Sequence, residues 1–303
     1  MIVITTPTGQ IGSQTLDRLL AEPGAAPAVR VIARDPARLP ARVRERVEVV
    51  QGSHADPDVL DTAYDGADAV LWLTPPPLTA PELEPHFRDF TLPTCAAIER
   101  HAVGRVVGVS TLGRGVAKRA GHITAALAMD ELIERTGVPY RALCMPGFME
   151  NLLPQAPAIT AESCFRTPVP LDHRLPTCAT RDIAAVAARL LLDGSWNGQE
   201  DVPVLGPEDL SPREMAAVMS EVLGREIRAE AVSVEAYRAG MLAHGASEAA
   251  AQGLADMMTE VVGRDLYDRE RYAATAAPSP TTFRQWCADV LAPALGAGAA
   301  RAS

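Results

Sequence analysis

Short apolar runs alternate with longer amphipathic segments through the first half of the chain. The runs are rich in Val and Ile, and the segments between them repeat apolar residues at helical spacing. Strands that are apolar throughout, each followed by a helix, are typical of a parallel sheet covered on both faces. The expected strands are residues 1–5, 29–33, 47–50, 67–73, 105–109 and 140–144, and the expected helices are residues 11–22, 82–101 and 123–135.

The pattern changes after Gly147, and proline becomes frequent between Pro154 and Pro176. Only one further strand is expected, which is too few for an independent sheet. With right-handed crossovers, the chain predicts an α/β protein with a Rossmann-type doubly wound parallel sheet. We expect the core in residues 1–150, a smaller C-terminal cap in residues 151–295 interleaved with the last core strands, and a flexible tail in residues 296–303. The elements expected in this half are a strand at 201–205 and helices at 182–192, 212–223, 233–262 and 282–291.

Composition and charge exclude several classes of protein. The 303 residues carry a formal net charge of −10, and the basic stretch at residues 38–46 looks like a solvated loop or helix, so direct nucleic-acid binding is not expected. The chain has no apolar run near the roughly 20 residues that span a membrane and no signal peptide. Five scattered cysteines without a CxxC pair predict neither a disulfide framework nor a metal site, and a reducing cytoplasm fits best.

A turn with two glycines, TPTGQIG at residues 6–12, lies between the first strand and the first helix. At this place a dinucleotide pyrophosphate meets the N–H groups of a helix N-terminus. Gly9 suits close approach of the phosphate, and Gly12 suits close packing of helix on strand. Thr6 stands where a GxxGxxG pattern has glycine and Pro7 lacks a donor, so an ordinary turn is the alternative. The residues predicted to bind the cofactor here are Thr6, Thr8, Gly9, Gln10 and Ile11.

The second strand ends at Arg34. An acidic residue at this place would bind the ribose 2′-hydroxyl of NAD, whereas an arginine can pair with the 2′-phosphate of NADP. Arg38 can add to that charge. We therefore predict NADP(H) as the cofactor, with NAD(H) less favoured; a simple exposed loop arginine is the alternative.

These segments, in this order, resemble the NmrA-like branch of the atypical short-chain dehydrogenase/reductase group over nearly the whole chain. The likeness is carried by ITTPTGQIG, VRVIARDPARLP, GADAVLWLTPPP and ELIERTGVPYRALCMPGFMENLL, among others. It implies a Rossmann core with a small α/β cap, NAD(P) binding, and either reduction of small molecules or redox-sensing regulation. At matching positions it implies further cofactor contacts by Ser53, Thr74, Pro75, Pro146 and Phe148.

The resemblance also shows a departure in the catalytic residues. Active short-chain reductases carry a Tyr and, four residues later, a Lys on the helix after the fifth strand, and this pair handles the proton. Counted from Asp130, these positions hold His122 and Ala126. Because an imidazole titrates near neutral pH, His122 is the candidate acid, helped by Thr111 at the family's Ser/Thr position. A helix-start residue that only packs is an equal alternative for His122.

Phe87 and Met149 are expected to line an apolar substrate pocket, with Asn151 at its mouth, although packing in the core is the usual role of such residues. Three functions stay open. The first is a cytoplasmic NADP(H)-dependent oxidoreductase acting on a small, largely apolar carbonyl, quinone, enone or imine compound. The second is a non-catalytic NADP(H)-sensing regulator acting through a protein partner, and the third is a non-redox cyclase or isomerase. A homodimer is compatible with each of them.

Overall fold

The computed structural model describes residues 1–21 and 28–299. These residues divide into two compact units that alternate along the chain. Unit 1 comprises Met1–Thr111, Ile123–Cys144 and Ile183–Val202, and unit 2 comprises Leu112–His122, Met145–Asp182 and the segment that begins at Pro203. Residues 183–202 return to the first unit after the segment Met145–Asp182 of the second. The assignment of residues 112–122 to the second unit is a feature that the sequence did not indicate.

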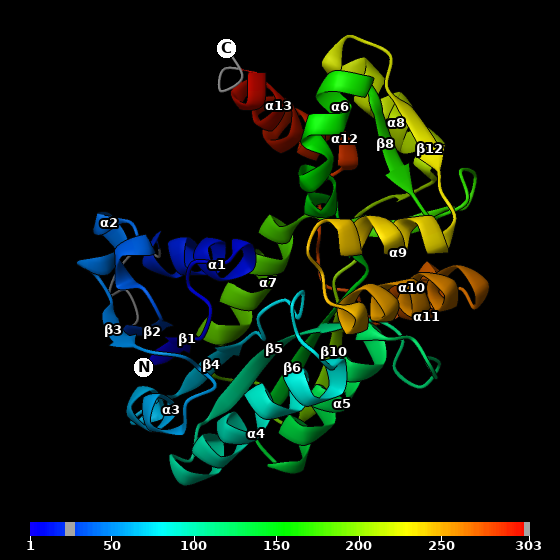
Figure 1. The fold of residues 1–303 in the computed structure, drawn as a ribbon. Coiled ribbons are helices and arrows are strands. Elements are labelled where there is room, and N and C mark those ends of the chain that lie inside the picture. Colours follow the sequence, from blue (N-terminus) through cyan, green and yellow to red (C-terminus); the bar gives the residue numbers. More distant parts are fainter. Residues whose placement is uncertain (22–27, 300–303) are drawn as a thin grey trace. The chain divides into compact units, whose positions relative to one another are not determined.

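Unit 1 is built on a seven-stranded sheet (Figure 1). In sheet order, its strands are β10 (Gln199–Pro203), β6 (Tyr140–Met145), β5 (Arg105–Thr111), β4 (Ala69–Trp72), β1 (Ile2–Ile4), β2 (Val29–Ala33) and β3 (Glu48–Gln51). Neighbouring strands from β5 to β3 are parallel. The chain runs outward from β1 to β3 on one side and from β4 to β10 on the other, so the topological switch point lies between β1 and β4. This order confirms the predicted doubly wound fold.

Helices cover both faces of this sheet (Figure 1). On one face lie α1 (Gln10–Ala21) and α7 (Thr180–Leu192), and on the other lie α3 (Pro57–Tyr64), α4 (Leu83–Arg100) and α5 (His122–Arg135). Two short helices, η1 (Pro36–Arg38) and α2 (Ala41–Arg44), connect β2 to β3 and carry the exposed basic stretch. The centre of the sheet is apolar, and all four residues of β4 are completely buried.

A buried carboxylate ties α5 to the strands beneath it. Asp130 accepts hydrogen bonds from Ser110 Oγ on β5 and, at 2.7 Å, from the Tyr140 hydroxyl on β6. Burial and this neighbouring carboxylate raise the pKa of Tyr140 well above its usual value, so the phenol remains a donor. Gly108 leaves room for it, because a Cβ there would lie 2.1 Å from the Tyr140 hydroxyl oxygen. The network is therefore part of the packed core.

Unit 2 contains two small sheets. One has the strand order β11 (Asp209–Leu210), β9 (Leu175–Cys178) and β7 (Gly147–Phe148), and the other pairs β12 (Arg228–Ala231) with β8 (Cys164–Thr167) in parallel. The hydrophobic pattern indicated none of these strands. Each has only two to four residues, which is too short to show an alternation.

The single helical region predicted at residues 233–262 is in fact two helices, α9 (Val234–Ala243) and α10 (Glu248–Gly263), which lie side by side (Figure 1). Gly245, with φ of 89°, follows the first helix, and the Ser247 side chain caps the second by accepting from the Ala250 N–H. The other helices of unit 2 are η2 (Met149–Gln155), α6 (Ala156–Glu162), α8 (Pro212–Leu223), α11 (Arg269–Tyr272), η3 (Ala273–Thr275), α12 (Phe283–Trp286), η4 (Cys287–Leu291) and α13 (Ala292–Ala299).

The predicted C-terminal tail begins inside α13, since this alanine-rich helix extends to Ala299; residues 300–303 lie outside the described residues. Within the described ranges, the helices are all too short or too polar to cross a lipid bilayer.

Candidate functional site

The turn after β1 offers backbone donors at the N-terminus of α1. Among the described residues, the N–H groups of Gln10, Ile11 and Gly12 make no hydrogen bond. The Gly9 N–H donates to the Thr6 carbonyl oxygen at 3.2 Å and closes the turn. Successive unpaired N–H groups at a helix N-terminus bind phosphate well, because the helix dipole adds to the hydrogen bonds. The structure thus brings together the residues that the sequence predicted for the pyrophosphate.

Glycine is needed for different reasons at the two glycine positions of this turn. A Cβ at Gly12 would lie 1.9 Å from the Thr6 carbonyl oxygen, so α1 packs on the turn too closely for any side chain. A Cβ at Gly9 would lie 3.5 Å from the same oxygen, which is an ordinary contact. The folded chain therefore requires glycine at position 12, whereas the fold alone leaves space for a small side chain at position 9.

Thr6 supplies a polar group that points to a ligand. Its Oγ1 is buried and has no hydrogen-bond partner within the described residues. A buried hydroxyl without a partner costs about 1–3 kcal/mol, and a polar ligand at the turn would recover that energy. The residues of the turn therefore fit a dinucleotide phosphate.

Thr5, which the sequence pattern did not single out, ties the phosphate turn to the strand across the switch point. Its buried Oγ1 donates to the Leu71 carbonyl oxygen at 3.0 Å and accepts from the Leu73 N–H at 3.2 Å. These bonds join the carboxyl ends of β1 and β4, where ligands of doubly wound sheets bind. They hold the phosphate turn beside the loop that carries Thr74 and Pro75.

Arg34 follows β2 directly, and its side chain is exposed. Within the described residues neither Arg34 nor Arg38 forms an ion pair. The neighbouring acid, Asp35, caps η1 by accepting from the Ala37 N–H at 3.0 Å, so its carboxylate is engaged in that turn. The end of β2 is consequently cationic, which favours a phosphate over a ribose hydroxyl.

His54, just after β3, lies buried among aromatic rings. The ring centroids of Trp72 and Phe90 are 5.6 and 5.0 Å from that of His54, and its Nε2 has no partner within the described residues. Burial above all, and then the positive charge of Arg34, lower the pKa of His54 to about 4. The imidazole is therefore neutral at neutral pH and is coupled electrostatically to Arg34. Its neighbour Ser53, predicted to contact the cofactor, is half-buried and accepts at Oγ from a backbone N–H at 3.2 Å.

The loop after β4 is held by the first turns of α4. His86 Nε2 lies 3.0 Å from the Pro75 carbonyl oxygen, and both Thr74 and Pro75 are half-buried. Phe87, on the same helix, is 8% exposed and meets the His86 ring edge-on at 5.8 Å. This burial favours a packing role for Phe87 over a place in a substrate pocket.

The remaining predicted binding residues lie in unit 2, in the segment after β6. Pro146 is buried, Phe148 is half-buried and Asn151 is exposed. Met149 is only 2% exposed and packs in the core of unit 2, which includes Phe165, Phe283 and Trp286. Its position also favours core packing over pocket lining.

Glu150 is a buried acid in this segment that the sequence pattern missed. Its carboxylate accepts from the N–H and Oγ1 of Thr180, at 3.1 and 2.8 Å, and from Trp286 Nε1 at 3.2 Å. These three bonds fix the segment to the start of α7 and to α12. The signal in the sequence is an acid within the apolar run at residues 148–153.

His122 begins α5, and its imidazole is engaged within unit 2. Its Nε2 lies 3.0 Å from the carbonyl oxygen of Ala250 in α10, so this nitrogen carries a proton and donates it to the carbonyl. The adjacent Gly121, with φ of 49°, packs so closely that a Cβ would lie 1.9 Å from the Gly253 carbonyl oxygen. An acid role for the Nε2 proton requires the bond to Ala250 to open. That role stays a prediction, as does the role of Thr111, which is half-buried at the end of β5 in unit 1.

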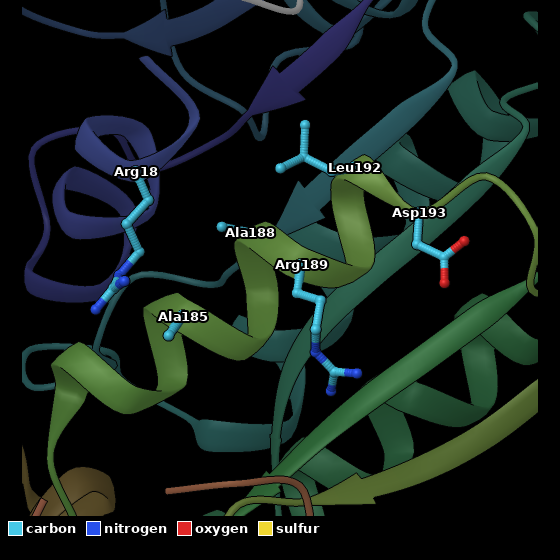
Figure 2. A pocket seen from close by; sticks show the side chains of 6 residues that line it. All are labelled: Arg18, Ala185, Ala188, Arg189, Leu192 and Asp193. Carbon is cyan, nitrogen blue, oxygen red and sulfur yellow. The ribbon is translucent and has the colours of Figure 1, made fainter. Parts of the chain in front are cut away.

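A pocket of about 430 Å³ lies elsewhere in unit 1, between the C-terminal halves of α1 and α7 (Figure 2). None of the residues predicted for the cofactor or the substrate lines it, so it is separate from the candidate site. Its lining residues are Arg18, Ala185, Ala188, Arg189, Leu192 and Asp193.

Comparison with known proteins identifies a matching family and several similar proteins. Residues 7–193 match the profile of a family described as NAD(P)H-binding. Over 300 residues the chain is 32% identical to (4-alkanoyl-5-oxo-2,5-dihydrofuran-3-yl)methyl phosphate reductase of Streptomyces griseus subsp. griseus, covering 95% of this chain and 97% of the relative. NAD(P)H azoreductase of Xenophilus azovorans is 28% identical over 267 residues, covering 86% of each protein.

A solved structure shows the same fold. The NADPH complex of an NADPH-dependent quinone oxidoreductase from Escherichia coli matches with a TM-score of 0.77 at 21% identity, covering 98% of this chain and 99% of that one. At 21% identity, this similarity shows only that the two chains share a fold.

Proposed function

Because the chain belongs to the NAD(P)H-binding, NmrA-like family of atypical short-chain dehydrogenases/reductases, we propose that it is an NADP(H)-dependent reductase of small molecules with a polarised double bond. The preferred acceptor is a carbon–carbon double bond conjugated to a carbonyl group, as in an acylated furanone. The observation that carries the proposal is the turn after β1, with its unpaired N–H groups and the unpaired Thr6 hydroxyl. Arg34 supplies the charge that distinguishes NADP from NAD.

The missing Tyr–Lys pair guides the choice of acceptor among the carbonyl, quinone, enone and imine compounds. A bound NADPH supplies a hydride. An isolated ketone then needs a proton on its oxygen as the new bond forms, and Ala126 cannot tune an acid for that step. In a conjugated acceptor, hydride adds to the β-carbon and the π electrons move to the carbonyl oxygen. Water then protonates the α-carbon, so no protein acid of matched pKa is required.

A second candidate is sensing of the NADP(H) redox state without turnover, which Ala126 also favours. The non-redox alternative requires a turn that excludes the dinucleotide. Pro7 removes one donor there, but the donors at Gln10, Ile11 and Gly12 remain unpaired among the described residues, and this supports dinucleotide binding.

Calorimetric titration with NADPH, NADP and NADH, followed by NADPH oxidation with a panel of acceptors, tests the proposal. We expect NADPH to bind well ahead of NADH, and to be consumed with an acyl butenolide but not with a saturated ketone. Binding without turnover on any acceptor would favour the sensor, and lack of binding to any dinucleotide would overturn both.

Thr6→Val is the sharper probe of the site, because it removes the hydroxyl and preserves the side-chain shape. Loss of one hydrogen bond to the ligand is expected to weaken NADPH binding about tenfold, equivalent to about 1.4 kcal/mol. Thr62→Val, on the exposed face of α3, is the matched control and should leave binding unchanged.

A further inference from the structure

The loop Leu112–His122 is a basic segment in an acidic protein. It carries Arg114, Lys118 and Arg119 and contains no Asp or Glu, while the chain as a whole has a formal net charge of −10. Lys118 is the only lysine among the 303 residues. The loop is therefore a second basic segment of the chain, besides the stretch at residues 38–46.

Lys118 and Arg119 are adjacent in the chain, and their charges are not compensated. Both side chains are exposed, and within the described residues neither makes a hydrogen bond or an ion pair. Several arginines of unit 2 pair with acids, for example Arg181 with Asp289 at 2.8 Å, whereas Arg228 on β12 has no acid partner within the described residues. Two adjacent cations without acids attract an anion from solution.

The backbone holds this loop in a defined shape. The Gly113 N–H donates to the Tyr272 hydroxyl at 3.0 Å, which in turn donates to the Leu266 carbonyl oxygen at 3.0 Å. The N–H groups of Val116 and Ala117 both donate to the Gly113 carbonyl oxygen, at 3.0 and 2.8 Å. With the close contact of Gly121 on α10 at the other end, the cations lie on a loop anchored at both ends.

The same loop starts beside the segment predicted to border the substrate. The Leu112 N–H donates to the Met145 carbonyl oxygen at 3.2 Å, and both residues belong to unit 2. The basic loop begins at Leu112 and residues 146–151 follow Met145, so both segments start at this hydrogen bond. The basic loop and the segment predicted to border the substrate thus belong to the same unit and start from the same pair of residues.

We propose that Lys118 and Arg119 bind an anionic group of the substrate, a phosphate monoester or a carboxylate. The proposal rests on the reductase function proposed above and narrows its substrates to anionic acceptors. An ammonium group supplies a compact charge, and a guanidinium supplies a planar pair of donors that matches two oxyanion oxygens. Phosphate and carboxylate share this chemistry, and the assay separates them.

The kinetic test uses one conjugated acceptor in three forms: an acyl butenolide with a hydroxymethyl group, its phosphate ester, and the corresponding carboxylate. The anionic forms should show kcat/KM at least tenfold above the neutral form, and the better of the two identifies the group. Lys118→Gln and Arg119→Gln should each remove about tenfold of that advantage through KM, with turnover of the neutral form unchanged. Arg228→Gln, an exposed arginine on β12, is the matched control.

A second readout is independent of turnover. Because Lys118 is the only lysine, acetylation of its side chain can be followed by peptide mass spectrometry without ambiguity. Inorganic phosphate or the butenolide phosphate should slow its acetylation relative to chloride at equal ionic strength. If anions protect Lys118 from acetylation but no acceptor is turned over, the anion site is supported and the reductase function is rejected. Equal kcat/KM for neutral and anionic acceptors, with no protection, would reject the anion site and leave the reductase intact.

Discussion

His54 offers a quantitative test of how the fold treats the region beside Arg34. The unfolded chain keeps an imidazole pKa near 6.5, whereas burial, and then the charge of Arg34, lower the folded value to about 4. Between these two values the unfolded chain binds more protons than the folded one. The free energy of unfolding must therefore fall as the pH drops from about 6.5 towards 4.

The magnitude follows from the two pKa values. Integrating the difference in bound protons from pH 7 to pH 5 gives a loss of about 2 kcal/mol, and the loss reaches about 3 kcal/mol at pH 4. His54→Gln removes the titrating group and keeps a polar side chain. Urea unfolding at pH 7, 6 and 5 should show that the wild type loses about 2 kcal/mol more than the variant over this range.

The other titrating groups are the same in both proteins, so their contributions cancel when the two pH dependences are compared. The measured quantity is therefore the difference between the two slopes of unfolding free energy against pH, and a change in stability at pH 7 does not affect it. His244→Gln, which changes an exposed histidine after α9, should follow the wild type. If the His54→Gln and wild-type curves run parallel down to pH 5, the ring is accessible to water and the reasoning from burial is refuted.

Four further substitutions probe the cofactor site and the candidate acid. Arg34→Asp should weaken NADPH binding by about 2 kcal/mol, roughly thirtyfold, and change NADH binding little; an unchanged preference in calorimetry would remove Arg34 from the site. Gly12→Ala should cost about 1–3 kcal/mol in urea unfolding, because its Cβ meets a backbone oxygen at 1.9 Å, whereas Gly9→Ala should keep stability and weaken dinucleotide binding. His122→Ala should lower turnover of a conjugated acceptor less than tenfold, because its Nε2 donates to a backbone carbonyl; a hundredfold loss would establish the imidazole as the acid.

The first half of the fold was predictable because most of its strands, namely β1, β2, β4 and β6, are buried almost throughout. Such strands read as continuous apolar runs, and β4 is fully buried along its length. The need for glycine at position 12 was also predictable from the turn motif, although its side-chain space is filled by the Thr6 carbonyl of the turn and not by a strand. The five strands of unit 2 lack such a signal, because a two- to four-residue strand depends on its partners and not on its own pattern.

Polar residues inside the protein were the harder part to predict. Glu150 is satisfied by Trp286, 136 positions further along the chain, and Thr5 is satisfied by residues on β4 more than 60 positions away. The pKa of His54 is lowered to about 4 because the fold buries it beside Trp72 and Phe90 and places the charge of Arg34 near it. In each case the sequence shows the residue type, but long-range packing decides whether it is buried, paired or ionised.

The structure also changes what is expected to select a substrate. Phe87 and Met149, the residues expected to give an apolar pocket, are 8% and 2% exposed, so their side chains have little surface left for a ligand. Of the unit 2 residues considered for the substrate, the exposed ones are polar or charged, namely Asn151, Lys118 and Arg119. Selection by charge at one end of the substrate therefore agrees better with the burial of these residues than selection by an apolar wall. In the proposed reductase, which leaves the proton to water, such a charge would supply position instead of acid catalysis, because it would hold one end of the substrate at a fixed place.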